Sequence, residues 1–234
     1  MRDRVPVGHQ NWRDLLFLHQ PVPAELLRRL VPQPLSIDSF DGQGWVTLIP
    51  FAIQASRPAG APERLGMSFL ETNLRTYVRS PQGEPGIFFF SLEASSWLAV
   101  AGARAGYALP YFPARMECHK DPGGATIRYR TVRRLGGAGA MLAATWHVGA
   151  PLGTAAPGTR DHFLVERYVL FAQRRGQILR ARVRHRPYPL CAATVTALEE
   201  TLCAEAGLPA MPPSPPAVHF SPGVDVDLFW RAAI

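Results

Sequence analysis

Lysine is almost absent from this sequence of 234 residues: of its 25 lysine and arginine residues, only Lys120 is a lysine. Arginine therefore supplies nearly all the positive charge behind the formal net charge of +7. Nucleic-acid-binding surfaces usually mix lysine with arginine and interleave aromatic side chains, and this sequence has no zinc knuckle, RNP-type string or helix-turn-helix spacing. We therefore expect no nucleic-acid partner, while a basic surface protein that uses its arginines stays open as an alternative.

Long apolar runs are missing as well. A membrane-spanning helix needs about 18 to 20 apolar residues, and the longest candidate, residues 97–108, is interrupted by Gly102, Arg104 and Gly106. The first residues, 1–6, lack the apolar core of a secretory signal. We expect no membrane partner and a cytoplasmic location.

Cysteine is scarce and carries no recognisable pattern. Cys118, Cys191 and Cys203 are odd in number, form no CxxC motif and have no activating neighbour evident in the sequence. We therefore expect free thiols, and neither a disulfide framework nor a cysteine nucleophile.

The motifs of several enzyme classes are absent too. The sequence has no GxSxG nucleophile elbow, no GxxxxGK[ST] phosphate-binding loop and no strand-GxGxxG-helix fingerprint. Its histidines occur without HxH or HExxH spacing. We expect no cofactor and no metal ion, although a metal site assembled from distant segments stays open.

Alternation of apolar and polar residues between Gly, Pro and Asp turns is the prevailing pattern that is present. It predicts strands over residues 15–22, 35–40, 45–53, 71–79, 87–93, 141–148, 169–173, 177–184 and 217–220, and a hairpin over 111–133. Helices are predicted over residues 23–30, 95–105, 161–168 and 194–206. We expect residues 1–234 to form a single domain, in which the Pro-rich residues 209–216 link to the last strand.

So many hairpin-linked strands favour an α+β fold built on an antiparallel β-barrel. The barrel should be closed or nearly closed, with a few helices packed on it, because closure removes exposed strand edges. A pocket is therefore expected where polar side chains point into the barrel.

On the strand over residues 71–79, Glu71, Asn73, Arg75, Tyr77 and Arg79 share one face, because neighbouring side chains point to opposite sides. This polar face is either solvated, as on any half-buried strand, or it lines a polar barrel interior. In the second interpretation Glu71 and Arg75 lie close enough to act on one ligand. A buried Glu71 should then be held near an arginine that balances its charge.

Two further strands carry candidates. Tyr111 shares a face with Arg115, and the pair could bind a carboxylate and supply a proton. His185 lies on the apolar side of its strand, either as a core histidine bonded to backbone or as a residue of the pocket. The opposite side of that strand carries a ladder that we expect to face solvent, formed by Arg180, Arg182, Arg184 and Arg186.

Several strings carry a resemblance that extends over nearly the whole chain. They are residues 11–19 (NWRDLLFLH), 40–51 (FDGQGWVTLIPF), 71–78 (ETNLRTYV), 109–116 (LPYFPARM), 161–168 (DHFLVERY) and 185–190 (HRPYPL). Through them the sequence resembles the YqjF-like family of uncharacterised bacterial proteins. That family is similar to the acetoacetate decarboxylase-like superfamily, which implies a cone-like antiparallel β-barrel around a small-molecule pocket.

The more distant resemblance also shows a departure. Acetoacetate decarboxylases carry a Pro-Lys-Lys string whose first lysine forms a Schiff base with the keto acid, whereas here Tyr111 and Phe112 stand where the two lysines would be. Glu71 resembles the pocket glutamate of that superfamily, which favours the inward interpretation of its strand face. Lys120 lies in a Lys-Asp-Pro-Gly-Gly string that predicts an exposed turn, where no desolvated amine is available.

Residues and resemblance together predict a cytosolic protein with a pocket for a small organic ligand. As an enzyme it would be a lyase, isomerase or cyclase that acts on a carboxylate- or carbonyl-bearing metabolite without a Schiff-base lysine. The alternative is a non-catalytic ligand-binding or sensor protein on the same barrel. Whether the chain forms a homo-oligomer stays open. The predicted catalytic residues are Glu71 and Tyr111, and the predicted substrate-binding residues are Arg75, Arg104, Arg115 and His185.

Overall fold

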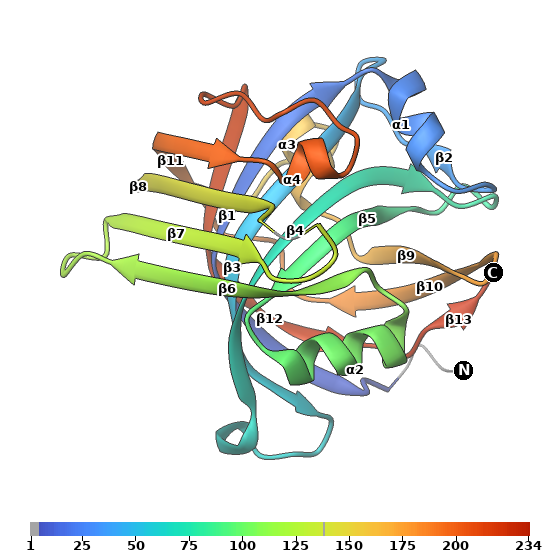
Figure 1. The fold of residues 1–234 in the computed structure, drawn as a ribbon, viewed down its shortest axis with the longest axis horizontal. Coiled ribbons are helices and arrows are strands. Elements are labelled where there is room, and N and C mark those ends of the chain that lie inside the picture. Colours follow the sequence, from blue (N-terminus) through green and yellow to red (C-terminus); the bar gives the residue numbers. More distant parts are fainter. Residues whose placement is uncertain (1–4, 138) are drawn as a thin grey trace.

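The structure is a computed structural model, which describes residues 5–137 and 139–234. Most of this chain is strand, with a few short helices (Figure 1). The strands are β1 (Gly8–Val22), β2 (Ser36–Ile37), β3 (Gly44–Pro58), β4 (Met67–Arg79), β5 (Pro85–Ala94), β6 (Tyr111–Lys120), β7 (Thr126–Arg133), β8 (Met141–Gly153), β9 (Val169–Arg174), β10 (Gln177–Arg184), β11 (Leu190–Glu200), β12 (Ala217–Leu228) and β13 (Ala232–Ala233). The helices are α1 (Ala24–Leu30), α2 (Trp97–Tyr107), α3 (Arg160–Val165) and α4 (Leu202–Glu205), with a 3-10 turn at Glu63–Leu65.

In the described residues the strands form one 13-stranded sheet, in the order β13-β10-β9-β5-β6-β7-β8-β11-β12-β1-β3-β4-β2. β4 also pairs with β5, and β10 with β12, so the sheet curls back on itself. Most neighbouring strands are antiparallel, but β5 runs parallel to β6 and to β9. A parallel pair needs a crossover connection, and α2 provides one between β5 and β6. The predicted, purely antiparallel arrangement is therefore wrong at β5.

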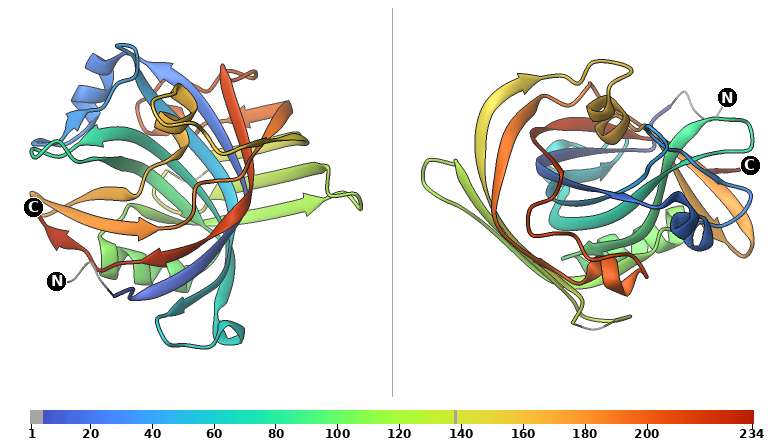
Figure 2. Two further views of the ribbon diagram at one scale, coloured as in Figure 1. Left: turned by 180° about the vertical axis from the view of Figure 1, so that it is seen from behind. Right: turned by 90° about the horizontal axis from the view of Figure 1, so that it is seen from above.

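Strands β1 and β3 have both faces covered. Leu15 and Phe17 of β1 belong to one apolar cluster, which includes side chains of β5, β9, β10 and α2. Leu16 and Leu18 belong to a second cluster, which includes side chains of β7, β8 and β11. Figure 2 shows the sheet curving so that these two groups of strands lie apart from each other. A side chain on either face of such a strand is buried, so burial extends along it without the usual alternation.

The strand β4 is buried in the same way, and this decides between the two interpretations of its polar face. Its residues from Glu71 to Val78 are buried without a break. Glu71, Asn73 and Arg75 are 3%, 6% and 5% exposed. The solvated interpretation of this face is therefore wrong for these three side chains.

Other differences from the sequence-based prediction follow from how the strands pair. The helix predicted over residues 194–206 is instead the strand β11 followed by the short helix α4. Thr194, Val195 and Thr196 begin that segment, and β-branched residues together with pairing to β8 favour the strand. The strand predicted over residues 35–40 is shorter, at Ser36–Ile37, and this strand, β2, pairs with β4.

The helices are short, and α3 has a side-chain cap. Thr159 caps α3 by accepting a hydrogen bond from the backbone N–H of His162. No helix within the described ranges is long and apolar enough to cross a membrane. Residues 1–4, part of the segment expected to lack a secretory signal, lie outside the described residues.

Candidate functional site

A cavity of about 470 Å³ lies among β1, β3, β4, β5, β10 and α2. Its volume is in the range of cavities that hold small organic ligands. Much of its wall is apolar or aromatic, including Trp12, Phe51, Phe69 and Phe89. A row of polar side chains on β4 interrupts this wall.

The polar row consists of Glu71, Asn73 and Arg75, which follow one another at every second position of β4 and all line the cavity. The residue between the first two, Thr72, faces the other side, where its hydroxyl lies 2.8 Å from the hydroxyl of Thr131. Strand geometry thus places a carboxyl, an amide and a guanidinium group on the same cavity wall.

Tyr111 meets this row from β6. Its hydroxyl donates a hydrogen bond of 2.7 Å to Glu71 Oε2. Strand pairing explains the meeting, because Leu92 of β5 is paired with Asn73 on one side and with Tyr111 on the other. The structure therefore brings together the two residues that the sequence nominated as catalytic.

The carboxyl group of Glu71 is in an unusual electrostatic position. Burial raises its pKa from the ordinary value of 4.5 to about 8, and the nearby Glu93 adds to the rise. Hydrogen bonds from Tyr111 and Asn73 lower the pKa but do not offset burial. Burial also raises the pKa of Tyr111 well above its ordinary value, so this hydroxyl stays protonated.

The arginine that we expected to balance Glu71 is not there. In the described part of the chain, Glu71 has Tyr111 as its bonded partner and forms no ion pair with Arg, Lys or His. A buried carboxylate without a cation is strongly disfavoured and takes up a proton instead. At pH 7 the group is therefore mostly the neutral acid.

Two polar atoms beside Glu71 have no partner. Asn73 Oδ1 and Arg75 Nε are buried and make no hydrogen bond within the described structure. Arg75 is held in place from its other end, where Nη2 donates to the carbonyl oxygen of Leu164 at 3.0 Å. Buried polar atoms without partners are uncommon in folded proteins, and these two belong to side chains that line the cavity.

A buried hydrogen-bonded chain supports the carbonyl of Leu164. The hydroxyl of Tyr77 donates to it at 2.7 Å. Tyr77 in turn lies 2.5 Å from the hydroxyl of Thr47, which lies 2.8 Å from Nδ1 of His19. The last step is 3.1 Å, from His19 Nε2 to His219 Nδ1.

The directions of the bonds from Leu164 to His19 follow from the end of this chain, because a carbonyl oxygen only accepts. Tyr77 donates to Leu164, so it accepts from Thr47, which accepts from His19 Nδ1. Burial, followed by the nearby His219, lowers the pKa of His19 well below its ordinary value, so His19 is neutral at pH 7. His19 Nε2 faces His219 Nδ1, and His219 Nε2 lies 3.4 Å from Asp161 Oδ1. The sequence could not reveal this chain, because its two histidines are 200 positions apart.

Three predicted substrate-binding residues do not line the cavity. Arg104 is exposed on α2, and its Nε donates to the backbone carbonyl of Tyr111 at 2.7 Å. Arg115 is 73% exposed and pairs with Glu117 at 3.0 Å, because β6 continues past the cavity. The expected convergence of Arg115 on the site of Tyr111 is therefore wrong.

His185 stands behind the cavity wall rather than in it. Its ring centroid lies 4.6 Å from that of Tyr188 and 5.9 Å from that of Trp12, and both of those residues line the cavity. Its Nδ1 bonds to the carbonyl oxygen of Arg186 at 2.7 Å. Burial lowers the pKa of His185. The expectation that it joins Glu71 and Tyr111 as a lining residue is wrong.

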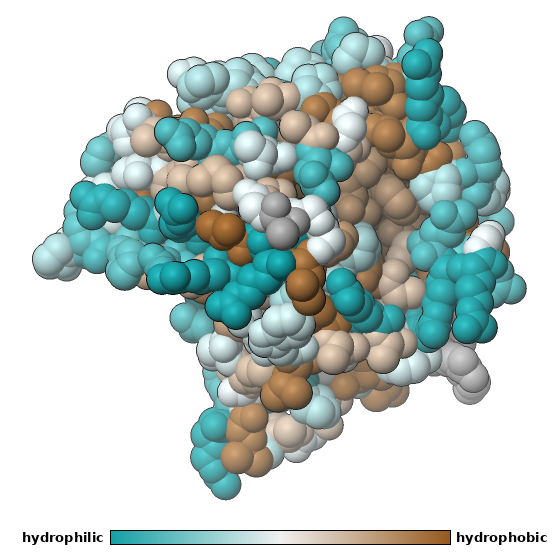
Figure 3. Space-filling view, in the orientation of Figure 1, coloured by the Kyte–Doolittle hydropathy of each residue, from teal (hydrophilic) through white to brown (hydrophobic). Residues whose placement is uncertain are grey.

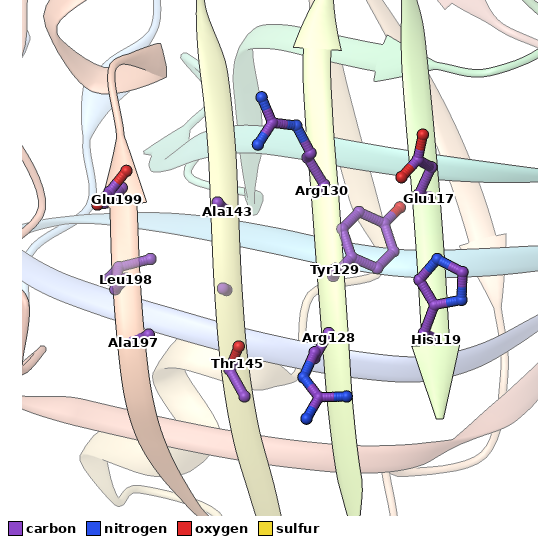
Figure 4. Close-up of a pocket in the computed structure, with 11 residues that line it drawn as sticks. Glu117, His119, Arg128, Tyr129, Arg130, Ala143, Thr145, Ala197, Leu198 and Glu199 are labelled. Carbon is purple, nitrogen blue, oxygen red and sulfur yellow. The ribbon is translucent and has the colours of Figure 1, made fainter. Parts of the chain in front are cut away.

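Figure 4 shows a second pocket, of about 290 Å³, on β6, β7, β8 and β11. Arg128 and Arg130 project from β7, and His119 from the adjacent β6, and all three are exposed. Glu117 at its edge already pairs with Arg115. These charges are solvated, whereas the cavity of about 470 Å³ is lined by buried side chains with unpartnered polar atoms, so that cavity is the candidate site. Within the described residues no group of three or more His, Cys, Asp or Glu is placed to hold a metal ion.

Comparisons with known proteins found relatives in sequence and in fold. The sequence matches the DUF2071 family, described as an uncharacterized conserved protein, over residues 9–225. It is 38% identical over 229 residues to the uncharacterized protein YqjF of Bacillus subtilis, with 97% of this chain and 92% of that protein covered.

Solved structures show a wider likeness of fold. The enduracididine biosynthesis enzyme MppR, complexed with pyruvate, superposes with a TM-score of 0.66 at 12% identity, covering 98% of this chain and 91% of its own. An acetoacetate decarboxylase from Legionella pneumophila gives a TM-score of 0.63 at 14% identity, covering 98% of this chain and 87% of its own. At these identities the likeness concerns the fold, and the predicted resemblance to the acetoacetate decarboxylase-like superfamily is confirmed at that level.

Proposed function

This chain belongs to the DUF2071 family, and we propose that it is an enzyme of small-molecule metabolism in which Glu71 transfers protons. One observation carries the proposal: the Glu71 carboxyl is buried in a cavity wall, bonded by Tyr111 at 2.7 Å, and has a pKa of about 8. A group whose pKa lies near the working pH is available as both acid and base. We propose that a cone-like closed barrel keeps solvent from this group.

The reaction that suits these residues is proton transfer next to a carbonyl group. The ionised Glu71 removes a proton from the carbon adjacent to the carbonyl, and the electron pair moves to give an enolate. The hydroxyl of Tyr111, which lies beside Glu71 and stays protonated, is the donor that can turn to the enolate oxygen. The neutral Glu71 then returns its proton to a different carbon or to a leaving group, which describes an isomerase, a lyase or a cyclase.

The free atoms of the wall fit the rest of such a substrate. Arg75 Nε offers a donor from a cationic group, and Asn73 Oδ1 offers an acceptor. A carboxylate or carbonyl oxygen suits the first, and a hydroxyl or amine hydrogen suits the second. The solved complex of MppR with pyruvate makes a short 2-oxo acid a suitable first probe for this chain.

An imine mechanism does not suit the single lysine. Lys120 is the last residue of β6, and its Nζ lies 2.5 Å from Asp14 Oδ2, so it is ion-paired and 45% exposed rather than free in a turn. It does not line the cavity. We expect borohydride treatment in the presence of a keto acid to leave the mass of the protein unchanged, and a mass increase mapped to Lys120 would contradict this.

The experiment that tests the function is hydrogen exchange at carbon. The protein is incubated with 2-oxobutanoate in D₂O, and loss of the C3 proton signal is followed by NMR. We expect exchange faster than in buffer, with a rate that rises toward pH 8 as Glu71 ionises. Glu71→Gln keeps the shape of the side chain and should abolish the exchange, whereas Glu117→Gln changes a solvated carboxyl and serves as the matched control.

The outcomes separate the two classes of function. Exchange that depends on Glu71 supports an enzyme. Saturable binding without any exchange would contradict the catalytic role and leave a ligand-binding or sensor protein. Equal exchange by the native protein and by Glu71→Gln would show that the carboxyl is not the base.

A further inference from the structure

One face of α2 turns small residues toward the cavity. Leu98, Gly102 and Gly106 follow one another at four-residue spacing along the helix, and all three line the cavity. A Cβ atom added at Gly102 or at Gly106 would meet no neighbouring atom within 4 Å. Both glycines therefore border open space rather than a packed neighbour.

Nothing in the backbone requires glycine at these two positions. Both lie inside the helix, and neither has a positive φ. Glycine within a helix costs about 1 kcal/mol relative to alanine. What the two residues provide is room on the cavity side of α2.

The cavity rim adds large apolar side chains that are exposed. Leu98 of α2 is 77% exposed, Trp230 is 44% exposed and Val7 is 38% exposed, and all three line the cavity. In Figure 3 the surface in the region of α2 includes tan and brown apolar residues beside white and teal ones. Exposed apolar side chains that gather at the rim of a cavity mark a binding surface.

The inner wall of the cavity has polar side chains, in contrast to the apolar side chains at its rim. The unpartnered atoms Asn73 Oδ1 and Arg75 Nε belong to side chains that are 6% and 5% exposed, and both side chains line this same cavity. A ligand that satisfied only these atoms would leave the apolar rim and the glycine face empty. A ligand that satisfied only the rim would leave two buried polar atoms unpaired, which is costly.

We propose that the cavity takes an elongated amphipathic ligand, a straight-chain 2-oxo acid of medium length. Its polar head lies at Asn73 and Arg75 beside Glu71, and its alkyl chain runs along Gly102 and Gly106 of α2 to the rim at Trp230. This rests on the proposed function and names the substrate class of that site.

The test measures how affinity depends on chain length. Binding of straight-chain 2-oxo acids from four to ten carbons is measured by isothermal titration calorimetry. Each methylene buried along α2 should strengthen binding roughly fourfold. Gly102→Leu fills the space beside the chain, so we expect it to weaken binding of the longest acid by at least about tenfold, equivalent to about two methylenes, while 2-oxobutanoate binds as before.

A matched variant separates this effect from damage to the helix. Ala105→Leu adds the same side chain at an exposed position of α2 that does not line the cavity, and it should keep the chain-length dependence. Leucine is a better helix former than glycine, so Gly102→Leu should melt no lower than the native protein. A binding defect in a protein that melts normally then reports on the cavity.

The outcomes distinguish this inference from the function on which it rests. Affinity that does not change with chain length, or that changes equally in Gly102→Leu and the native protein, overturns the inference and leaves the proposed function standing. A chain-length dependence of binding alongside hydrogen exchange that is equal in Glu71→Gln and the native protein contradicts the proposed function alone. No binding at any chain length overturns both.

Discussion

Glu71 and Glu93 carry the same carboxyl group on neighbouring strands, and both are buried, at 3% and 0% exposure. They nevertheless face opposite sides of the sheet, because Glu93 is paired in register with Thr72, the residue that follows Glu71. Glu93 meets Arg133, whose Nη2 and Nε lie 2.5 and 3.1 Å from Glu93 Oε1. Glu71 meets a tyrosine hydroxyl and no cation.

The difference shows how one residue type serves two purposes. Burial raises the pKa of both carboxyl groups, but Arg133 pulls that of Glu93 back toward its ordinary range. The guanidinium of Arg133 is itself stacked over the ring of Phe112, 4.0 Å from its centroid. Glu93 is therefore fixed as half of a structural ion pair. Glu71, with no such partner and with open space beside it, is the carboxyl that can exchange a proton with a ligand.

Breaking the ion pair should give the largest effect on stability. Arg133→Met leaves Glu93 as an uncompensated buried charge, and we expect a loss of about 3 to 5 kcal/mol in the free energy of unfolding. Urea denaturation measures it. Adding Glu93→Leu to that variant should recover much of the loss, because no buried charge is then left alone.

The control for this variant is Arg115→Met. It breaks the ion pair between Arg115 and Glu117, which has the same two residue types but an arginine side chain that is 73% exposed. Such pairs contribute little, so we expect a change below about 1 kcal/mol. Equal losses in the two arginine variants would show that burial does not distinguish the two ion pairs.

Glu71→Gln should instead raise the free energy of unfolding, and the size of the increase should depend on pH. The folded pKa of about 8 lies above the unfolded value of 4.5, so between these pH values the folded state holds a proton that the unfolded state has lost. The stability of the native protein then falls as pH rises through this window, by up to about 1.4 kcal/mol per pH unit. The glutamine variant lacks this loss, so its advantage in urea denaturation should grow from pH 5.5 to pH 7.5.

A constant difference between Glu71→Gln and the native protein over that range would show that Glu71 ionises normally. Glu117→Gln, at a half-exposed carboxyl bonded to Arg115, is again the matched control and should show no such growth.

Strand parity was enough to nominate Glu71, Arg75 and Tyr111 from the sequence, because alternate residues of a strand must share a side. Parity could not show how far along a strand a cavity extends. Arg115 has the parity of Tyr111 but lies four residues further on, roughly 13 Å at the usual rise per residue. Parity also could not distinguish a solvated face from an enclosed one, since that depends on which strands pack against it.

Contacts between residues far apart in the chain also could not be predicted from the sequence. Nothing in the sequence indicates that His19 and His219 meet, or that Arg133 reaches Glu93, because both contacts join segments brought together only by the sheet order. The sequence predicts a helix over much of the strand β11 for a related reason. Its pairing with β8 outweighs local helix propensity, and pairing is invisible in a single sequence.

The buried histidines should make stability fall on acidification. Burial lowers the pKa of both His19 and His219. Below pH 6.5 the unfolded state therefore binds protons on these histidines that the folded state does not bind. Stability is fully present above pH 6.5 and is lost as pH falls, by up to about 1.4 kcal/mol per histidine over the first pH unit. Urea denaturation at pH 7 and pH 5.5 should show His19→Asn losing less than the native protein. If the two proteins lose stability equally, the histidine pair is not neutral in the folded state.

The smallest effects should come from the arginine ladder of β10, and they refine the distinction between paired and unpaired charges. Arg184 and Arg186 are exposed, as predicted, and replacing either by Gln should change the free energy of unfolding by about 0.5 kcal/mol or less.

Arg180 departs from that prediction: its side chain is 17% exposed, and its Nε and Nη2 lie 2.5 and 2.6 Å from the two carboxylate oxygens of Glu84. A half-buried pair bonded at both oxygens should contribute more than a solvated one, so Arg180→Gln should cost about 1 kcal/mol. Urea denaturation of the single variants gives the order. If Arg180→Gln lowers the free energy of unfolding no more than Arg186→Gln does, then hydrogen bonding of one arginine to both carboxylate oxygens adds no stability here. The large effect expected for the ion pair of Arg133 and Glu93 would then depend on burial alone.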